Sequence, residues 1–271
     1  MLIRFCVFLL ESSPALRRLL WRWWYGRLAG KYTARDWTFM NYGYVPPAGT
    51  APLQLDPADE PDRFCAQLYD HVARPAQLAN ANVLEVGSGR GGGASFLTRT
   101  LQPKNYTGVD FSPQAVALCQ TRHAAVANLE FVVGDAEKLP FADASFDVVV
   151  NVESSHCYGH IDRFFSEVAR VLRPGGRFAY TDFRSVADMA ALTQLLAATP
   201  GFELVEQEDI TARVLAALVA DDTRKRALIA EFVHPRLHHL FGEFAGLSGG
   251  EMFRGFTDRS LTYQRFLLLR R

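Results

Sequence analysis

Residues 83–93 read V-L-E-V-G-S-G-R-G-G-G, and this stretch decides the fold of the chain. The first four residues are apolar apart from Glu85, as expected for a short buried strand, and five of the next seven are glycine. A strand that passes through a glycine-rich turn into a helix lets a ligand approach bare backbone amides. Nucleotide-like cofactors bind in this way at the carboxyl ends of parallel strands. Residues 83–93 therefore predict a cofactor site.

Strands and helices are expected to alternate through the chain that follows. We predict strands at 83–86, 106–110, 129–133, 146–152, 177–182, 202–206 and 260–269. We predict helices at 64–78, 94–101, 113–124, 161–172 and 186–198, and a helical insertion at 211–246. This alternation indicates an α/β fold in which a mostly parallel sheet carries helices on both faces.

Length, charge and cysteine content narrow the class of protein. With 271 residues the chain is long enough for one large domain, or one domain with an insertion. Its 29 basic and 29 acidic residues cancel, which argues against nucleic acid as a partner. Cys6, Cys65, Cys119 and Cys157 lie far apart, so they form neither a disulfide framework nor a zinc motif. This usage fits a reducing compartment, and we expect a cytoplasmic protein. The oligomeric state is not predicted.

The N-terminal segment allows two interpretations. Residues 14–28, P-A-L-R-R-L-L-W-R-W-W-Y-G-R-L, interleave arginine with leucine and tryptophan. Such a helix packs its aromatic side chains on the domain as a wall of a substrate pocket, or it lies on a membrane surface as a peripheral contact. The apolar run at residues 2–10 is far shorter than the roughly 20 residues that a membrane-spanning helix needs.

One weak pattern leaves the identity of the cofactor open, and three further features indicate which cofactor binds. Gly87, Gly89 and Gly92 satisfy G-x-G-x-x-G with Asp110 downstream, a weak pattern that is also compatible with NAD. Glu85, however, would repel a pyrophosphate and would suit a cationic sulfonium ligand with an ammonium group. The acidic turn at 134–141 can accept a hydrogen bond from an adenine amino group. The segment L-R-P-G-G at 172–176 lies between a predicted helix and a strand. These features favour S-adenosylmethionine.

The motifs together resemble a known family. E-V-G-S-G (85–89), G-V-D (108–110), G-D-A-E-K-L-P-F (134–141), F-D-V-V (146–149) and L-R-P-G-G (172–176) are similar to the motifs of class I S-adenosylmethionine-dependent methyltransferases. The resemblance covers residues 83–183 and is strongest to the ubiquinone-biosynthesis type of small-molecule methyltransferase. The segments 59–64, 91–101 and 151–158 further resemble mycobacterial fatty-acid and phthiotriolone-lipid O-methyltransferases.

The resemblance implies a fold, a cofactor and its contacts. The fold would be Rossmann-like, with a seven-stranded sheet and a helical lid, and the cofactor would be S-adenosylmethionine. Asp110 would accept both ribose hydroxyls; its competing role as a helix cap falls better to Ser112, which precedes Pro113. The residues expected to bind the methionine part, the ribose or the adenine are Glu85, Gly87, Ser88, Gly89, Asp110, Phe111, Asp135, Ala136 and Asn151.

Catalysis requires mainly alignment, because the methyl group of a sulfonium is already activated. A hydroxyl acceptor also needs its proton removed. His156 follows the strand at 146–152, and Asp182 ends the strand at 177–182, so both should emerge beside the cofactor. We predict that His156 is the general base and that Asp182 orients its imidazole. Alternatively, His156 caps a helix or lines the pocket, and Asp182 holds a backbone amide. His160 has metal-like spacing to His156 but no further ligands, so no metal is predicted.

The acceptor is expected to be apolar. We divide the chain into an N-terminal lid segment (1–62), a cofactor-binding core (63–210), a helical lid insertion (211–247) and a C-terminal strand (248–271) that completes the sheet. Both lid segments are rich in aromatic residues, which suits a lipid, fatty acid or polyketide. The residues expected in the substrate pocket are Trp24, Trp37, Tyr42, Tyr158 and Phe241.

The sequence therefore predicts an S-adenosylmethionine-dependent O-methyltransferase that acts on a hydroxyl, or a carboxyl, of an apolar small molecule. Three alternatives stay open. One is carbon methylation of an enolisable molecule. Another is an NAD-dependent oxidoreductase, against which Glu85 and the acidic turn count. The last is a non-catalytic cofactor-binding protein that docks through its N-terminal helix.

Overall fold

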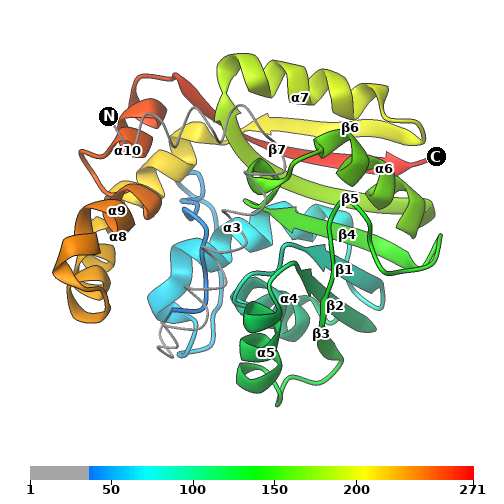
Figure 1. The fold of residues 1–271 in the computed structure, drawn as a ribbon, viewed down its shortest axis with the longest axis horizontal. Coiled ribbons are helices and arrows are strands. Elements are labelled where there is room, and N and C mark those ends of the chain that lie inside the picture. Colours follow the sequence, from blue (N-terminus) through cyan, green and yellow to red (C-terminus); the bar gives the residue numbers. More distant parts are fainter. Residues whose placement is uncertain (1–36) are drawn as a thin grey trace.

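A computed structural model describes residues 37–271 (Figure 1). Its strands are β1 (Asn82–Val86), β2 (Asn105–Asp110), β3 (Leu129–Val133), β4 (Phe146–Val152), β5 (Leu172–Ser185), β6 (Phe202–Asp209) and β7 (Leu261–Arg270). Its α-helices are α3 (Arg63–Ala73), α4 (Gly92–Leu101), α5 (Pro113–Arg122), α6 (Ile161–Val171), α7 (Val186–Ala198), α8 (Thr211–Phe232), α9 (His238–Phe244) and α10 (Glu251–Thr257). Short 3-10 helices are η1 (Glu60–Asp62), η2 (Arg74–Ala76), η3 (Ser155–Cys157) and η4 (Pro235–Leu237).

The seven strands form one sheet in the order β3-β2-β1-β4-β5-β7-β6. All neighbours are parallel except β7, which runs antiparallel to both β5 and β6. The prediction of a mostly parallel seven-stranded sheet is confirmed. The strand order reverses direction between β1 and β4, and ligands of open α/β sheets bind outside the carboxyl ends of the strands at such a point.

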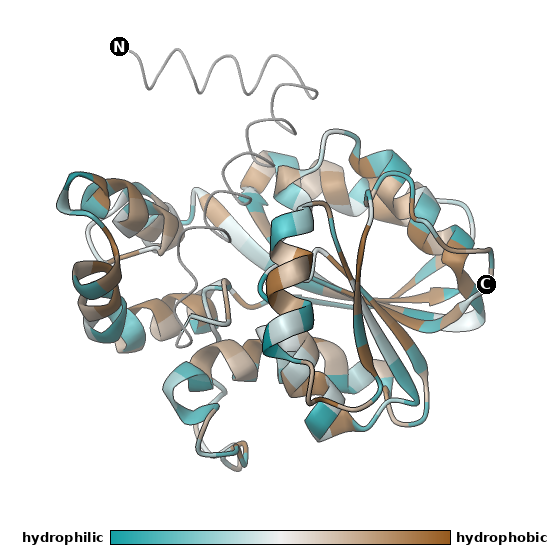
Figure 2. Cartoon of the chain, turned by 60° about the horizontal axis from the view of Figure 1, so that its bottom comes forward, coloured by the Kyte–Doolittle hydropathy of each residue, from teal (hydrophilic) through white to brown (hydrophobic). Residues whose placement is uncertain are grey.

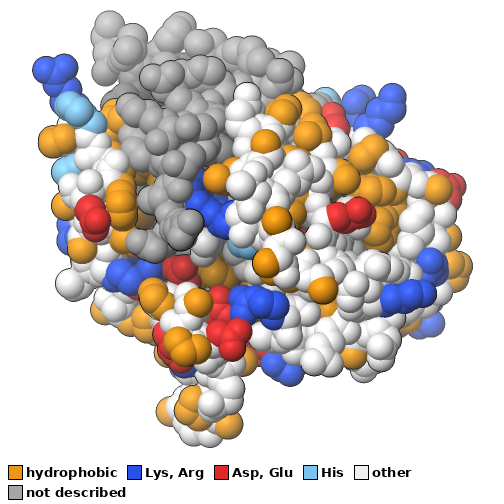
Figure 3. Space-filling model, turned by 90° about the horizontal axis from the view of Figure 1, so that it is seen from below, with side chains coloured by type: hydrophobic (Ala, Val, Ile, Leu, Met, Phe, Trp, Pro, Cys, Tyr) orange, Lys and Arg blue, Asp and Glu red, His pale blue; other side chains and the backbone are white. Residues whose placement is uncertain are grey.

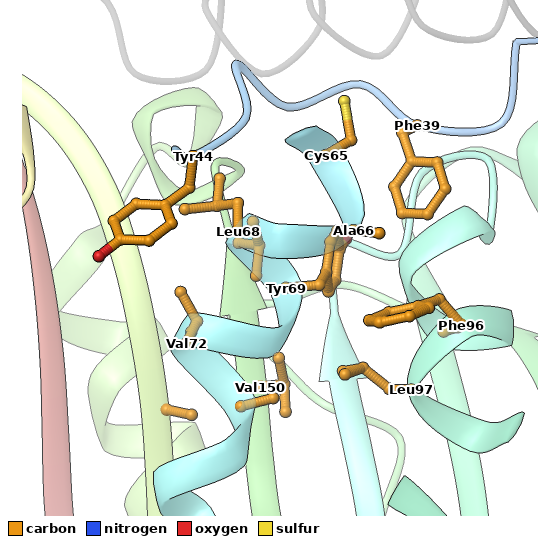
Figure 4. Packing of buried hydrophobic residues seen from close by; sticks show 14 of the residues in the cluster. Phe39, Tyr44, Cys65, Ala66, Leu68, Tyr69, Val72, Phe96, Leu97 and Val150 are labelled. Atoms are coloured by element: carbon orange, nitrogen blue, oxygen red, sulfur yellow. The ribbon is translucent and has the colours of Figure 1, made fainter. Parts of the chain in front are cut away.

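Each face of the sheet packs against its own set of helices. On one face, α3, α4 and α5 bury a cluster that includes Leu68, Tyr69 and Phe96 against strand residues such as Val150 (Figure 4). On the other face, α6 and α7 pack around Phe164 and Leu192. The helices carry both hydrophobic and hydrophilic residues, as amphipathic helices on a sheet should (Figure 2).

Helices α8, α9 and α10 gather at one end of the molecule, between β6 and β7 in the chain (Figure 1). Helix α8 contacts α9, α10 and β7, so this helical end is attached to the last strands. The predicted helical insertion at 211–246 is seen as α8, η4 and α9. The segment 248–271 differs from expectation, because it begins with α10 before β7 completes the sheet. No helix within residues 37–271 is long and apolar enough to cross a membrane.

Several element ends differ from the predicted ones, most of all in β5. The strand was expected at 177–182 but runs from Leu172 to Ser185. Its partner β7 explains part of the extension, since the antiparallel ladder pairs nine consecutive residues, Arg177 to Ser185, with β7. Strand β6 likewise runs on to Asp209 because it pairs with β7. These pairings are between distant segments and leave no local mark in the sequence.

Candidate active site

The glycine-rich turn after β1 is held by the end of β2. The backbone N–H groups of Gly87 and Ser88 both donate to the carbonyl of Val109, at 2.8 and 3.1 Å. The N–H of Gly89 donates to Oδ2 of Asp110 at 2.9 Å. Gly87 and Gly89 have φ angles of 78° and 55°, in the left-handed region that glycine adopts without strain. The turn therefore presents backbone at the carboxyl edge of the sheet.

Asp110 stands at the end of β2, where ribose recognition was predicted. Its Oδ1 accepts the N–H of Ser112 at 2.9 Å. Burial raises the pKa of its carboxyl group above the usual value, although the backbone N–H groups of Ser112 and Gly89 partly offset this. The Ser112 hydroxyl caps α5 by accepting the N–H of Ala115 at 3.2 Å. The prediction that Ser112, rather than Asp110, caps this helix is confirmed.

A cavity opens over the glycine-rich turn, and we call it the glycine cavity. Residues 38–41, Tyr69, the ends of β2 and β4 and the residues that follow β2, β3 and β4 also line it. The predicted cofactor residues that line it are Gly87, Ser88, Gly89, Asp110, Phe111, Asp135 and Ala136. The structure thus brings these residues together around one cavity, and their contacts with a cofactor stay a prediction.

Glu85 and Asn151 do not line the glycine cavity. The Glu85 carboxylate is fully buried and accepts hydrogen bonds from the hydroxyls of Tyr69 and Tyr106, at 2.7 and 2.9 Å. Burial raises its pKa to about 7, although both tyrosines favour the charged form. Asn151 donates from Nδ2 to the carbonyl of Val86 at 2.8 Å. Glu85 is linked to the cavity only indirectly, because Tyr69, which donates to it, lines the cavity. Asn151 joins β4 to the residue before the glycine-rich turn.

The chemistry of the cavity fits S-adenosylmethionine. Among the described residues, Ser88 Oγ is a buried side-chain oxygen with no hydrogen-bond partner in the protein. A Cβ atom on Gly89 would meet only Met40 Cε, at 3.7 Å, so at Gly89 a ligand can come close to the backbone. Phe111 is partly exposed at the wall, and an aromatic ring is a suitable stacking partner for an adenine. Asp110 supplies the carboxylate that ribose hydroxyls need.

A second cavity lies beside the first, and we call it the apolar cavity. Its walls come from residues 37–42, the start of α3, and helices α8 and α9. Three of the residues predicted for the substrate pocket, Trp37, Tyr42 and Phe241, line the apolar cavity. Tyr158 lines the glycine cavity instead. Trp24 and the segment 14–28 lie outside the described residues.

The apolar cavity is held by a small charged network. Arg224 on α8 forms an ion pair with Asp62 at 2.9 Å and with Asp221 at 2.7 Å. The hydroxyl of Thr38 donates to the same Asp62 carboxylate at 3.1 Å. Three segments distant in sequence are therefore joined at the rim, and the rings of Trp37 and Phe241 meet edge to face at 6.1 Å.

His156 and Asp182 pair as the sequence predicted. Nδ1 of His156 lies 2.9 Å from Oδ1 of Asp182, and its backbone N–H donates to Oδ2 at 3.0 Å. Asp182 is fully buried and also accepts the Ser155 hydroxyl at 2.6 Å and pairs with Arg184 at 3.1 Å. His156 packs against the ring of Phe183 at 4.8 Å. Neither member of the pair lines the two cavities.

The charges of this pair are set by their surroundings. Burial opposes the charged carboxylate of Asp182, but Arg184 and His156 hold the pKa of Asp182 well below its usual range. Burial also opposes the imidazolium, yet Cys157 and Asp182 more than offset it and raise the pKa of His156 to about 10. Asp182 therefore favours the protonated imidazole, and a base role for His156 requires a pH above its raised pKa.

One residue at this edge was missed by the sequence reasoning. Glu153 follows β4, lines the glycine cavity and is the first acidic residue after the end of that strand. Its signal is the acidic residue in the segment N-V-E-S-S-H-C-Y at 151–158, which also contains His156. A carboxylate directly after a central parallel strand is as strong a pointer to a site as a histidine is.

The rest of the described surface offers few competing sites. Within residues 37–271, no group of three or more His, Cys, Asp or Glu side chains is arranged to hold a metal ion. On the face seen in Figure 3, basic and acidic side chains are interspersed rather than gathered into a patch of one sign.

Comparisons with known proteins show the family to which the chain belongs. The model of a methyltransferase domain matches residues 84–180. The chain is 41% identical over 257 residues to a phthiotriol/phenolphthiotriol dimycocerosates methyltransferase of Mycobacterium tuberculosis, covering 94% of this chain and 93% of that protein. It is 45% identical over 199 residues to a fatty-acid O-methyltransferase of Mycolicibacterium smegmatis, covering 71% of each chain.

Among solved structures, a putative sarcosine dimethylglycine methyltransferase from Galdieria sulphuraria has the same fold, with a TM-score of 0.69 at 17% identity. The match covers 89% of this chain and 97% of that one. The predicted class I methyltransferase fold is confirmed, and so are the enzyme class and its cofactor, in preference to NAD-dependent oxidation. The chain belongs to the family of S-adenosylmethionine-dependent methyltransferases.

Proposed function

We propose that this enzyme transfers a methyl group to an oxygen of a long, apolar lipid, either a hydroxyl or a carboxyl. The observation that carries the proposal is the shared wall of the two cavities, because Phe39, Met40 and Asn41 line both. An apolar chain held against α8 and α9 would then present one end to the cofactor. The two mycobacterial relatives, named for dimycocerosate and fatty-acid methylation, support the same acceptor class.

This arrangement suggests a separate role for each segment of the chain. We infer that the core at 63–210 binds the cofactor and that 1–62 and 211–247 cover the acceptor, with 248–271 completing the sheet. In support, residues 37–42 and helices α8 and α9 supply most of the apolar cavity wall. A role of residues 14–28 at this wall or at a membrane surface is a further part of the proposal, which truncation of that segment would test.

We also propose that His156 and Asp182 take part in the transfer. Asp182 fixes the imidazole at Nδ1, which supports the predicted orienting role. Because the pKa of His156 is raised to about 10, a transfer that uses this histidine as its base would keep accelerating with pH up to about that value. The pH profile of the reaction therefore tests the role directly.

The test is transfer of a labelled methyl group from S-adenosylmethionine to two matched acceptors. One is a long-chain fatty acid, and the other is a hydroxylated long-chain ester without a free carboxyl. Label on either acceptor supports lipid O-methylation, and its position tells hydroxyl from carboxyl. Label on neither, with S-adenosylhomocysteine bound normally in calorimetry, would contradict the proposed acceptor class.

A further inference from the structure

Glu153 has a backbone conformation that its residue type does not favour. Its φ of 48° lies in the left-handed region, where a non-glycine residue is strained by about 1 to 3 kcal/mol. Six other non-glycine residues of the described chain share a positive φ, and none of them lines either cavity. Strain at a cavity wall persists only where the surrounding contacts hold it, and such positions gather at functional sites.

The contacts that hold Glu153 come from three segments. Its own N–H donates to the carbonyl of Thr181 on β5 at 3.0 Å. Its Oε1 accepts the N–H of Tyr42 at 2.9 Å and the hydroxyl of Tyr263 on β7 at 2.6 Å. Both side-chain hydrogen bonds fall on Oε1, so Oε2 takes part in neither. The carboxylate is thus fixed in position and retains one oxygen with which to accept a proton.

The position of Glu153 relates it to both cavities. It lines the glycine cavity together with Ser154 and Cys157, beside the turn at Gly87. The residue that donates its N–H to Glu153, Tyr42, lines the apolar cavity. Residues 39–41, directly before Tyr42, line both cavities. We propose that Glu153, rather than His156, is the general base that accepts the proton of a hydroxyl acceptor at the junction of the two cavities.

This proposal rests on the proposed function and makes it more specific. As the acceptor oxygen bonds to the methyl carbon, the carbon–sulfur bond breaks, its electron pair stays on sulfur, and the hydroxyl proton passes to Glu153. The products are a methyl ether, S-adenosylhomocysteine and a neutral carboxyl group. A carboxylate acceptor carries no such proton and would be repelled by an ionised Glu153, so the assignment favours hydroxyl acceptors.

The protonation state of Glu153 suits this role. Burial raises its pKa to about 7, although the hydrogen bonds from Tyr263 and Tyr42 oppose the shift. The charged groups that face it are Asp182 of β5, which raises the pKa, and His156 of η3, which lowers it. A base is most effective when its pKa lies near the working pH. Activity that depends on ionised Glu153 is lost as pH falls below about 7.

The experiment compares the wild-type enzyme with Glu153→Gln on the same two acceptors, the hydroxylated ester and the fatty acid, from pH 5.5 to 10. Glutamine keeps an oxygen for the Tyr42 N–H but accepts no proton. For the hydroxylated ester we expect kcat to fall about 10²-fold or more and the rise in rate near pH 7 to disappear. Calorimetric affinity for S-adenosylhomocysteine should stay unchanged, which shows that the variant folds. Glu203→Gln on β6 removes a partly exposed carboxylate and serves as the matched control.

Each result decides between the proposals. If Glu153→Gln methylates the ester at the wild-type rate, or if its rise near pH 7 persists, Glu153 is not the base. If the wild type labels only the fatty acid, the base role is overturned while lipid O-methylation stands. If the wild type labels neither acceptor, the proposed function itself fails, and the base role falls with it.

Discussion

The two cavities differ in what builds them. The glycine cavity is shaped by backbone: a turn at residues 87–93 and the ends of parallel strands, fixed by main-chain hydrogen bonds such as Gly87 N–H to Val109. The apolar cavity is shaped by side chains from residues 37–42 and helices α8 and α9. Cofactor binding should therefore respond to changes in backbone conformation, whereas acceptor choice should respond to the size of individual side chains.

The largest effect is expected where backbone matters most, at Gly87. In Gly87→Ala the new Cβ would overlap the Ser154 hydroxyl and lie 2.9 Å from the hydroxyl of Tyr158, at a φ of 78° that alanine disfavours. We expect affinity for S-adenosylhomocysteine, measured by calorimetry, to fall more than about 100-fold, or about 2.7 kcal/mol.

Gly175→Ala is the matched control for backbone strain alone. Gly175 has a φ of 83°, but a Cβ atom there would meet nothing within 4 Å. We expect a loss of stability of about 1 kcal/mol and unchanged cofactor affinity. Equal binding losses in the two variants would mean that strain, and not the crowding at Ser154, explains the effect at Gly87.

A smaller loss is expected at Asp110, whose side chain holds the turn and which we propose binds the ribose. Asp110→Ala removes the acceptor of the Gly89 and Ser112 N–H groups, at 2.9 Å each. Calorimetry should show cofactor affinity reduced more than about tenfold, the effect of losing charge-assisted hydrogen bonds. An unchanged affinity would contradict the ribose-binding role of Asp110. It would also contradict the view that cofactor binding depends on the conformation of the backbone turn.

The His156–Asp182 pair lines neither cavity. We therefore expect substitution of His156 to change first the free energy of unfolding of the protein. The pKa of His156 is about 10 in the folded protein against an ordinary value of 6.5. The protonated imidazole therefore stabilises the fold fully below pH 6.5, less between 6.5 and 10, and not above 10.

The variant His156→Gln tests whether the stabilisation by His156 decreases as pH rises. Its deficit in unfolding free energy, from denaturant titration, should be on the order of 1 kcal/mol or more at pH 6 and should shrink toward pH 10. A deficit that stays constant over this range would mean that the histidine is neutral when folded. That result would return His156 to the position of a base competent at neutral pH.

The same contrast explains what the sequence could predict. The strand at 83–86, the glycine turn, Asp110 and the cap at Ser112 are close together in the chain, and their local pattern predicts the strand, the turn and the helix cap around which the glycine cavity opens. Pairing of β7 with β5 and β6 joins residues more than fifty positions apart, so the true ends of β5 and β6 were not predicted.

Glu85 and Glu153 show which features of the site a local sequence pattern cannot predict. Glu85 was expected at the cofactor because a carboxylate suits a cationic sulfonium ligand, and its side chain is hydrogen-bonded to Tyr69 and Tyr106, which come from α3 and β2. The local pattern could place Glu153 at the end of β4, but it could not show that Tyr42 and Tyr263, about 110 residues away on either side, fix its carboxylate. Local pattern thus predicts backbone sites well, and a buried carboxylate's role depends on partners that pattern does not reveal.

The smallest effect is expected in the apolar cavity, where one side chain among many contacts the acceptor. Leu228 on α8 lines this cavity, and Leu228→Ala removes part of its apolar contact. With about 0.8 kcal/mol for each buried methylene, KM for the lipid acceptor should rise about three- to tenfold in a labelled-methyl assay. Affinity for S-adenosylhomocysteine should not change. Val219→Ala, an exposed position on the same helix, is the control and should leave both values unaltered. A Leu228 variant that weakens cofactor binding as much as acceptor binding would show that the two cavities are not separable, and the distinction between backbone-built and side-chain-built sites would no longer hold.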